Sequence, residues 1–327
     1  MITLGIESSC DETSIALLKN DRIIVNNTHS QDIHSLYGGV VPEIASRAHI
    51  QKIDRLCLDA LKKSNTGFDD IDLVAVTDRP GLAGALLVGI SFGLGLHTGY
   101  QIPITGVNHL EGHIASVTLQ HPDIAFPFLA LVVSGGHTAL YRVDDFGEYT
   151  SLGQTIDDAA GEAFDKIGKM LGFAYPAGRA IEQEASLYDG KELIAFPVAR
   201  ISNAPLNFSF SGLKTAVKYY IAEKGEEFCA LNRPFICHSF QKAIITSLIR
   251  NTGNAIKMTG INTVALVGGV ACNTTLRQAL KDSFGENVYF PSPKLCTDNA
   301  AMIAKAGYER YKRGIIRRPR MSPSAAL

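Results

Sequence analysis

Two histidines four residues apart, His109 and His113, are the side chains of this chain best suited to bind a metal ion. On an α-helix this spacing puts both imidazoles on one face, about 6 Å apart along the axis. Two imidazoles placed in this way can take two positions on one transition metal. Such a pair is also found as two solvated or core histidines, so a third ligand from elsewhere in the chain is needed to favour a metal.

A zinc peptidase carries its catalytic glutamate directly after the first histidine, where it acts as a base toward metal-bound water. Here Leu110 follows His109, and the nearest glutamate is Glu111, one position further on. Two residues turn a helix by about 200°, so Glu111 is expected to point away from the face that holds the histidines. The pattern predicts a metal clamp without a peptidase base.

Three turns of small or polar residues follow predicted buried strands, and each is suited to hold a phosphate. They lie at residues 7–14, 134–136 and 268–269. The Ser-Gly-Gly turn at 134–136 is the best cradle, because its glycines let backbone N–H groups approach an anion closely. Ordinary hairpin and strand–helix connections have the same composition, so the turns alone leave both interpretations open.

The elements that must position these residues alternate between strands and helices, which indicates an α/β protein. From residue 128 the order of strand, small-residue turn, strand, turn and strand is the same as at the N-terminus, although the letters differ. The chain is therefore expected to contain a repeat of topology. Strands are expected at 2–6, 15–18, 23–25, 71–76, 105–107, 128–133, 139–143, 149–152 and 263–267, and helices at 42–63, 82–99, 109–116, 157–171, 213–258 (two) and 298–313.

The composition is that of a compact soluble protein, and 327 residues suit two domains or one bilobed unit. A net charge of −1 excludes a global field that recruits nucleic acid or membrane, so any such contact needs a local patch. Six basic residues between 310 and 320 form one candidate patch for a phosphate backbone, or a merely solvated tail. The sequence contains no CxxC pair and nothing that resembles a signal peptide. The longest apolar stretch, at 82–96, is expected to be too short for a bilayer, and together these features favour a reducing cytoplasm.

Seven segments, in their order along the chain, resemble the universal tRNA threonylcarbamoyladenosine transferase family, in its bacterial TsaD form. This family was formerly described as a glycoprotein endopeptidase family. The resemblance extends from Ile2 to about Tyr308, and Val132 stands where archaeal and eukaryotic members carry a tyrosine. The segments are Gly5–Thr13, Gly38–Ala48, Asn108–His113, Ser134–Thr138, Asp157–Lys166, Gly268–Asn273 and Thr297–Ala300.

The resemblance implies an α/β, actin/hexokinase-like ATPase (ASKHA) fold with two lobes of duplicated topology and a nucleotide and metal cleft between them. The lobes are expected at residues 1–107, completed by a C-terminal helix at 298–327, and at residues 108–297. The resemblance also implies one Fe²⁺ or Zn²⁺ per subunit, held by His109, His113 and Asp298. By its position alone, Asp298 is equally suited to cap the helix that follows it.

The implied activity is transfer of the threonylcarbamoyl group from threonylcarbamoyl-AMP to the N6 amine of the adenosine 3′ to the anticodon, position 37 of the tRNA. The product is N6-threonylcarbamoyladenosine (t6A) in tRNAs that read codons beginning with A, and AMP is released. Asp11 and Glu12, in the first turn, are candidates to accept the proton of the amine. The implied adenine-nucleotide site, for threonylcarbamoyl-AMP, AMP, ADP or ATP, consists of Val132, Val133, Ser134, Gly135, Gly136, Asp165, Gly178, Glu182 and Asn273.

The implied partners are tRNA, a TsaB-like paralogue and a TsaE-like ATPase, in the cytoplasm and without a membrane. Two other functions are considered. A metallopeptidase is disfavoured by the orientation expected of Glu111 and leaves the glycine turns unexplained. A nucleotide-binding or ATPase scaffold without transferase activity suits the fold, since a fold does not determine chemistry, but it does not account for a complete metal triad.

Overall fold

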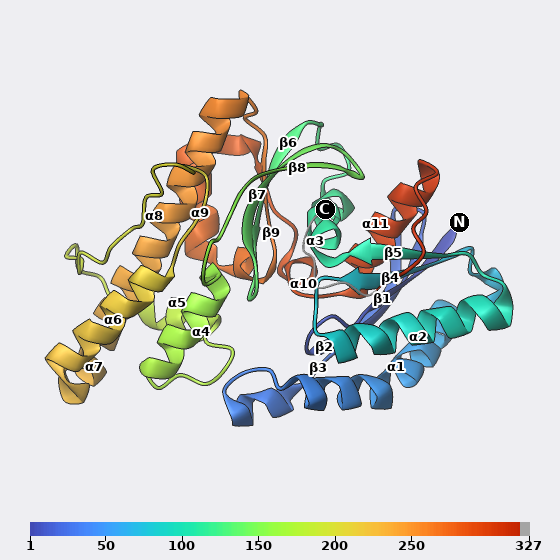
Figure 1. Ribbon diagram of the computed structural model, residues 1–327, viewed down its shortest axis with the longest axis horizontal. Helices are drawn as coiled ribbons and strands as arrows, with labels where there is room; N and C mark the ends of the chain where they lie inside the picture. Colours follow the sequence, from blue (N-terminus) through green and yellow to red (C-terminus); the bar gives the residue numbers. More distant parts are fainter. Residues whose placement is uncertain (321–327) are drawn as a thin grey trace. The chain divides into compact units, whose positions relative to one another are not determined.

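The computed structural model describes residues 1–320 and divides them into two compact units (Figure 1). Unit 1 contains Met1–Ile124, the short segment Asp144–Tyr149 and residues 291–320. Unit 2 contains Ala125–Val143 and Thr150–Phe290. Each unit is built around one five-stranded sheet.

The sheet of unit 1 has the strand order β3-β2-β1-β4-β5. β1 runs antiparallel to β2 and parallel to β4, and β4 runs parallel to β5. Because β1, β4 and β5 are parallel, their carboxyl ends meet at one edge, where ligands bind in open α/β sheets. The strands are β1 (Ile2–Glu7), β2 (Glu12–Lys19), β3 (Arg22–Ser30), β4 (Leu73–Arg79) and β5 (Ile104–Asn108).

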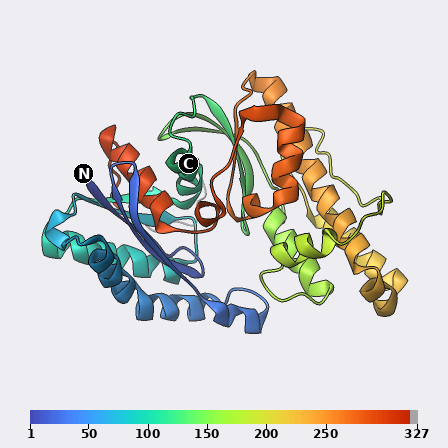
Figure 2. The same cartoon turned by 180° about the vertical axis from the view of Figure 1, so that it is seen from behind.

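Helices cover both faces of this sheet, as the alternation of side chains along β2 requires. Ile15 and Leu17 pack into the cluster that includes residues of α1 (Pro42–Ser64) and α2 (Ala83–Tyr100). The intervening Ala16 and Leu18 pack against α11 (Ala300–Lys312). Figures 1 and 2 show α1 and α2 along one face of the sheet and α11 on the other, beside α3 (His109–Gln120).

Helix α2 has 18 residues and a mean hydropathy of 1.2, so by length and composition alone it is able to cross a membrane. The expectation that this stretch is too short was therefore wrong, because the helix continues past residue 96 to Tyr100. Two of its glycines, Gly89 and Gly93, lie against the sheet of unit 1. A Cβ added to Gly89 would come within 2.4 Å of Ser8 Oγ, and one at Gly93 within 3.1 Å of Ile104 Cδ1. Helices that pack on the core of a folded unit pass the same test of length and composition.

The sheet of unit 2 has the order β10-β9-β6-β7-β8. β6 runs antiparallel to β7 and parallel to β9, and β9 runs parallel to β10. β6 thus pairs with β7 and β9 as β1 pairs with β2 and β4, at the same places in the strand order, and the repeat expected from the sequence is confirmed. The strands are β6 (Phe128–Val133), β7 (Thr138–Asp145), β8 (Glu148–Gln154), β9 (Val264–Val267) and β10 (Val288–Tyr289).

The helices of unit 2 include the long helix α8, whose buried residues are apolar ones such as Phe240 and Leu248 together with polar ones such as Gln241 and Asn251. The region expected to hold two long helices contains a third, short helix, α7, between them. The α-helices are α4 (Ala160–Met170), α5 (Gly178–Ala185), α6 (Ser211–Lys224), α7 (Glu226–Leu231), α8 (Arg233–Thr259) and α9 (Thr274–Phe284). The remaining short helices of the two units are η1 (Asp32–Tyr37), η2 (Phe68–Asp70), η3 (Gly269–Cys272), η4 (Gly285–Asn287) and α10 (Pro293–Cys296).

The units differ from the expected lobes in the assignment of α3, which was expected to begin the second lobe at residue 108. In the structure α3 packs against α11 and belongs to unit 1. The contact is close, since a Cβ added to Gly112 would lie 2.7 Å from Ile303 Cδ1. The helix expected at 298–327 ends at Lys312, and residues 321–327 of that range lie outside the described part of the chain.

Candidate metal centre and nucleotide-binding turns

The two histidines of the candidate metal centre lie in the first turns of α3, directly after β5. Asn108 caps the helix, because its side-chain Oδ1 accepts a hydrogen bond from Leu110 N at 2.8 Å. His109 and His113 are both buried, so the helix presents both imidazoles within the protein, at the carboxyl end of the unit 1 sheet.

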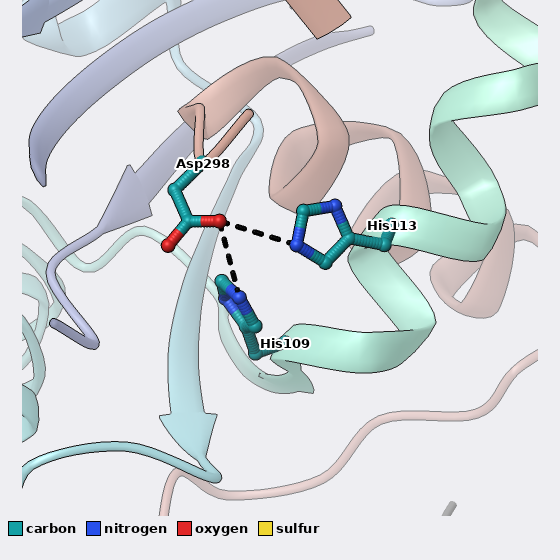
Figure 3. Close-up of side chains that lie close together, drawn as sticks. All are labelled: His109, His113 and Asp298. Carbon is teal, nitrogen blue, oxygen red and sulfur yellow. Dashed lines mark ion pairs between the residues drawn. The ribbon is translucent and has the colours of Figure 1, made fainter. Parts of the chain in front are cut away.

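Asp298 lies two residues before α11 begins, in the same unit. It is not the N-cap of that helix: Asn299 takes this role and accepts a hydrogen bond from Met302 N at 3.1 Å. Asp298 Oδ1 is instead 3.3 Å from His109 Nε2 and 3.2 Å from His113 Nε2, and Figure 3 shows the three side chains pointing toward one another.

These separations fit a shared metal ion. Ligand atoms about 2.0–2.1 Å from a tetrahedral ion are about 3.3 Å apart. One potential ligand atom from each of the three side chains lies within 4.8 Å of the others. Nε2 of the buried His113 has no hydrogen bond of acceptable geometry among the described residues, so a metal would supply the partner that this nitrogen lacks.

A buried carboxylate behind His109 orients its ring. His109 Nδ1 is 3.0 Å from Glu7 Oε2 and 3.2 Å from Ser9 Oγ, which turns Nε2 toward Asp298. Glu7 is fully buried at the end of β1 and accepts hydrogen bonds from Thr77 Oγ1 (2.6 Å) and Ser9 N (2.5 Å). Ligating histidines are commonly held by such a carboxylate. No such role for Glu7 was predicted from the sequence, where it appeared only as part of the turn at 7–14, although an acidic residue that ends a buried strand was the available signal.

The charges around the centre depend on one another. Burial lowers the pKa of His109, but the carboxylates of Asp298 and Glu7 outweigh burial and hold this pKa well above its usual value. Burial raises the pKa of Asp298, and the charge of His109 outweighs it, so this pKa lies below the usual range. Burial lowers the pKa of His113 and favours its neutral form, which is the form that binds metals.

Asp11 and Glu12, the candidate proton acceptors, lie where β2 begins. Burial raises the pKa of Glu12 well above its ordinary value, and the carboxylates of Asp298 and Asp11 raise it further. A carboxylate of raised pKa is a better base near neutral pH. The same surroundings, burial first, raise the pKa of the Cys10 thiol, so this cysteine is not an activated nucleophile.

In unit 2, the Ser-Gly-Gly turn joins β6 to β7 and is closed by its own hydrogen bonds. Ser134 N donates to His137 O at 2.8 Å, and His137 N donates to Ser134 Oγ at 3.1 Å. Helix α4 begins against this turn: Gly161 N donates to Ser134 O, and a Cβ at Gly161 would lie only 2.4 Å from that oxygen. A Cβ added to Gly135 or Gly136 would meet nothing within 4 Å, so the turn has open space beside it.

The Gly-Gly turn after β9 lies beside the Ser-Gly-Gly turn, because β6 and β9 are parallel neighbours. Gly268 has a φ of +95°, and a Cβ there would lie 2.5 Å from Val133 O. Only glycine suits this conformation and this close approach. The side chains of Val132 and Val133 are buried in the sheet, so these residues present only their backbone to a ligand at this edge.

The remaining predicted nucleotide residues make hydrogen bonds of their own in the helices of unit 2. Asp165 Oδ1 accepts from Ala177 N, next to Gly178, which starts α5. Glu182 Oε1 accepts from Thr274 N and Thr274 Oγ1, both at 2.6 Å, and from Thr275 N at 3.2 Å. Asn273 caps α9 through Leu276 N and donates to Gln241 Oε1. Glu182 and Asn273 thus stabilise the start of α9, a role that the sequence did not predict.

The orientation expected of Glu111 is confirmed, since its oxygens contact Arg310 and Tyr149 and not the histidines. The ion pair of Glu111 with Arg310 also shows that the basic surface expected at 310–320 is smaller than its six basic residues suggested. Arg310 is 1% exposed and Arg313 is paired with Asp145 and Glu309, so neither adds to a free basic surface. The exposed basic residues that remain after α11 are Arg317, Arg318 and Arg320.

Comparison with solved structures gives matches across nearly the whole chain. HypF of T. kodakarensis has a TM-score of 0.64 at 14% identity, covering 96% of this chain and 48% of HypF. Component A of (R)-2-hydroxyglutaryl-CoA dehydratase from Acidaminococcus fermentans has a TM-score of 0.57 at 14% identity, covering 95% of this chain and 99% of that protein. At such identities the likeness shows the fold alone, and it confirms the actin/hexokinase-like ATPase fold.

Sequence comparison gives much higher identity. A tRNA N6-adenosine threonylcarbamoyltransferase of Clostridium kluyveri is 47% identical over 317 residues, which cover 95% of this chain and 93% of that protein. One of Geobacter sulfurreducens is 47% identical over 319 residues, which cover 94% and 91%. The family model described as TsaD, tRNA N6-adenosine threonylcarbamoyltransferase, matches residues 22–305. The chain therefore belongs to the TsaD family of transferases.

Proposed function

We propose that this chain transfers the threonylcarbamoyl group of threonylcarbamoyl-AMP to the N6 amine of adenosine 37 in tRNAs that read codons beginning with A. The reaction forms t6A and releases AMP. Membership of the TsaD family supports this activity. The observation that carries its assignment to particular residues is the convergence of His109 Nε2, His113 Nε2 and Asp298 Oδ1.

His109, His113 and Asp298 are proposed to hold one Fe²⁺ or Zn²⁺, both of which accept this ligand set. When bound, such an ion supplies Lewis acidity that polarises a carbonyl oxygen. Glu7 holds the ring of His109 in the orientation that leaves Nε2 available. The three side chains come from α3 and from the segment that leads into α11, two helices that pack directly against each other, so the ligands are preorganised.

The nucleotide portion of the donor is proposed to bind at the carboxyl edge of the unit 2 sheet. The backbone N–H groups of the turn 134–136 would hold the AMP phosphate and stabilise the charge that develops as AMP leaves. Asp165 and Glu182 would contact the ribose, each with a carboxylate that is already oriented by a backbone bond. Gly178, Asn273 and the backbone of Val132 and Val133 would complete the contacts.

The exocyclic amine of adenosine must lose a proton during the transfer, and Glu12 or Asp11 is proposed to accept it. The raised pKa of Glu12, caused first by burial, supports this role. The adenosine must also leave the stack of its loop to be modified, as is usual when enzymes act on a base. A TsaB-like paralogue, a TsaE-like ATPase and a cytoplasmic location are proposed from the resemblance to the family.

The test replaces one ligand and keeps the rest of the helix. His109→Ala is incubated with threonylcarbamoyl-AMP, tRNA and the partner proteins, and t6A is measured by mass spectrometry of digested tRNA. We expect loss of t6A in His109→Ala and normal t6A in the control His121→Ala, since His121 lies beyond the last residue of α3. Undiminished t6A in His109→Ala would overturn the proposed metal role.

A further inference from the structure

A buried ion pair connects α3 to α11 on the side away from the candidate metal centre. Glu111 Oε2 accepts a hydrogen bond from an Arg310 Nη at 2.9 Å, and Glu111 Oε1 accepts one from Tyr149 OH at 3.1 Å. The side chains of Arg310 and Glu111 are 2% and 3% exposed. All three residues belong to unit 1, although they are far apart in the sequence.

The position of Glu111 relates it to the metal ligands. It lies two residues from both His109 and His113, so its side chain leaves α3 on the opposite face. Asp298 lies two residues before α11 begins, whereas Arg310 is in the last turn of this helix, about 15 Å from Ala300 along the helix axis. One face of α3 therefore contacts the segment that leads into α11, and the other face contacts the end of α11.

These two attachments fix the rotation of α3 about its own axis. An imidazole nitrogen lies about 6 Å from that axis, so a rotation of about 10° moves it by about 1 Å, half of a metal–ligand bond length. The apolar contact at Gly112 sets how closely the helices approach. Apolar contacts are not directional, whereas the Glu111 carboxylate is bound to two fixed donors.

Stability alone is a poor explanation for the pair. Replacing a buried ion pair by apolar side chains of similar size is often neutral or stabilising, because burial of the charges costs as much as their attraction returns. Here Arg310 Nε is buried and has no hydrogen-bond partner among the described residues, so the desolvation of this guanidinium is incompletely offset. A geometric role accounts better for a pair of this kind.

We propose that Glu111 is a positioning residue, which with Arg310 and Tyr149 holds α3 in the rotation that brings His109 and His113 to Asp298. This inference rests on the metal centre proposed above. It gives the glutamate between the two histidines a role that is neither peptidase base nor metal ligand.

The test removes the pair without leaving a buried charge. The full-length double variant Glu111→Leu/Arg310→Met is prepared without metal and titrated with Zn²⁺ in competition with a chromophoric chelator. We expect a Kd for Zn²⁺ that is about 10- to 100-fold higher than in the wild type, the usual effect of losing an outer partner of a metal site. Titration with Co²⁺ should show a weaker tetrahedral absorption band, while the thermal unfolding midpoint stays near that of the wild type.

A matched control pair is present on α11 itself. The side chains of Lys305 and Glu309 are 5% and 7% exposed and 2.7 Å apart. The Lys305 ammonium contacts Asp21, Glu309 and the rings of Phe146 and Tyr308, none of which belongs to α3. Lys305→Met/Glu309→Leu should keep the Kd for Zn²⁺ within twofold of the wild type. A wild-type Kd in Glu111→Leu/Arg310→Met would overturn the inference.

A third variant decides the question if the double variant does not fold. Tyr149→Phe removes one hydrogen bond and no charge, and it should raise the Kd for Zn²⁺ about three- to tenfold, because Tyr149 OH is one of the two donors that hold the Glu111 carboxylate. An unchanged Kd in Tyr149→Phe would contradict the positioning role. Failure of the underlying metal proposal has a different signature: wild type and His109→Ala would then bind Zn²⁺ equally well.

Discussion

The turns after β1 and β6 occupy equivalent places in two sheets of the same topology, yet their chemistry differs. β1 ends in a buried acidic residue, Glu7, which orients His109. β6 ends in an apolar residue, Val133, and the glycines that follow leave the backbone accessible. One topology thus places a proposed ligand-binding edge in each unit, while the last strand residue and the turn set the chemical groups that the edge presents.

The helices next to these turns differ in the same way. In unit 1 the first residue of α3 is His109, at the end of a parallel strand, so a side chain enters the site. In unit 2, residue 161 is a glycine, and the absence of a side chain there allows the start of α4 to approach the Ser-Gly-Gly turn closely. Unit 1 therefore offers side-chain ligands, which suit a metal, and unit 2 offers backbone donors, which suit a phosphate.

The largest effect is expected from removing a proposed metal ligand in unit 1. Asp298→Ala should raise the Kd for Zn²⁺ on the order of 100-fold or more, because the loss of an outer partner already costs 10- to 100-fold. The Kd for ADP, which is proposed to bind in unit 2, should stay within twofold of the wild-type value, as measured by calorimetry. If Asp298→Ala lost affinity for both Zn²⁺ and ADP, the assignment of metal to unit 1 and nucleotide to unit 2 would be contradicted.

The next largest effect concerns the close approach of α4 to its turn. Gly161→Val places side-chain atoms where even a Cβ lies 2.4 Å from Ser134 O, so it should lower the free energy of unfolding by about 3 kcal/mol and weaken ADP binding. Gly212→Ala is the control, since Gly212 lies in α6 of unit 2, outside the proposed nucleotide site, and a Cβ there meets nothing within 4 Å. Chemical denaturation and calorimetry measure the two effects, and a stable Gly161→Val with normal ADP affinity would show that the contact is dispensable.

A smaller effect is expected from the outer partner of His109. Glu7→Gln keeps the shape of the side chain but removes the charge that favours the Nδ1–H form of the ring, so the Kd for Zn²⁺ should rise about 10- to 100-fold. Measurement is by chelator competition. If Glu7→Gln binds Zn²⁺ as the wild type does, the contrast drawn between Glu7 and Val133 loses its basis.

The smallest effect is a pH dependence in unit 2. Burial raises the pKa of Asp158, but hydrogen bonds from Lys166 and Lys214 outweigh it and hold the pKa below its usual value. A lowered folded-state pKa adds stability above the unfolded-state pKa of about 3.9, and this stability is lost as the pH falls through the folded-state pKa.

Asp158→Asn should therefore lower the free energy of unfolding by about 1 kcal/mol at pH 7, a value reduced for the partial exposure of Lys166, and by less near pH 2, where protonation of the carboxylate weakens the pair. Urea unfolding at both pH values provides the measurement. Asp145→Asn in unit 1 is the counterpart: its partner is Arg313, its carboxylate is 43% exposed, and its cost should stay below about 0.5 kcal/mol. Equal costs for the two variants would contradict the role assigned to burial.

The fold class, the repeat of topology and the side-chain directions on α3 were determined by local sequence. The alternation of apolar runs with small-residue turns is sufficient to predict the α/β class and the repeat of topology, because side-chain period and turn composition are local properties. The spacing of His109 and His113 predicted their common face and the opposite direction of Glu111, since helix geometry is set by the backbone.

Other features were decided only by tertiary structure. Whether Asp298 caps a helix or faces the histidines depended on Asn299, which takes the cap and leaves the Asp298 carboxylate available. The place of α3 in unit 1 depended on its packing against α11, and the burial of Arg310 depended on Glu111, 199 residues away in the sequence. Contacts between distant segments are set by packing and by the pairing of buried charges, which local pattern does not encode.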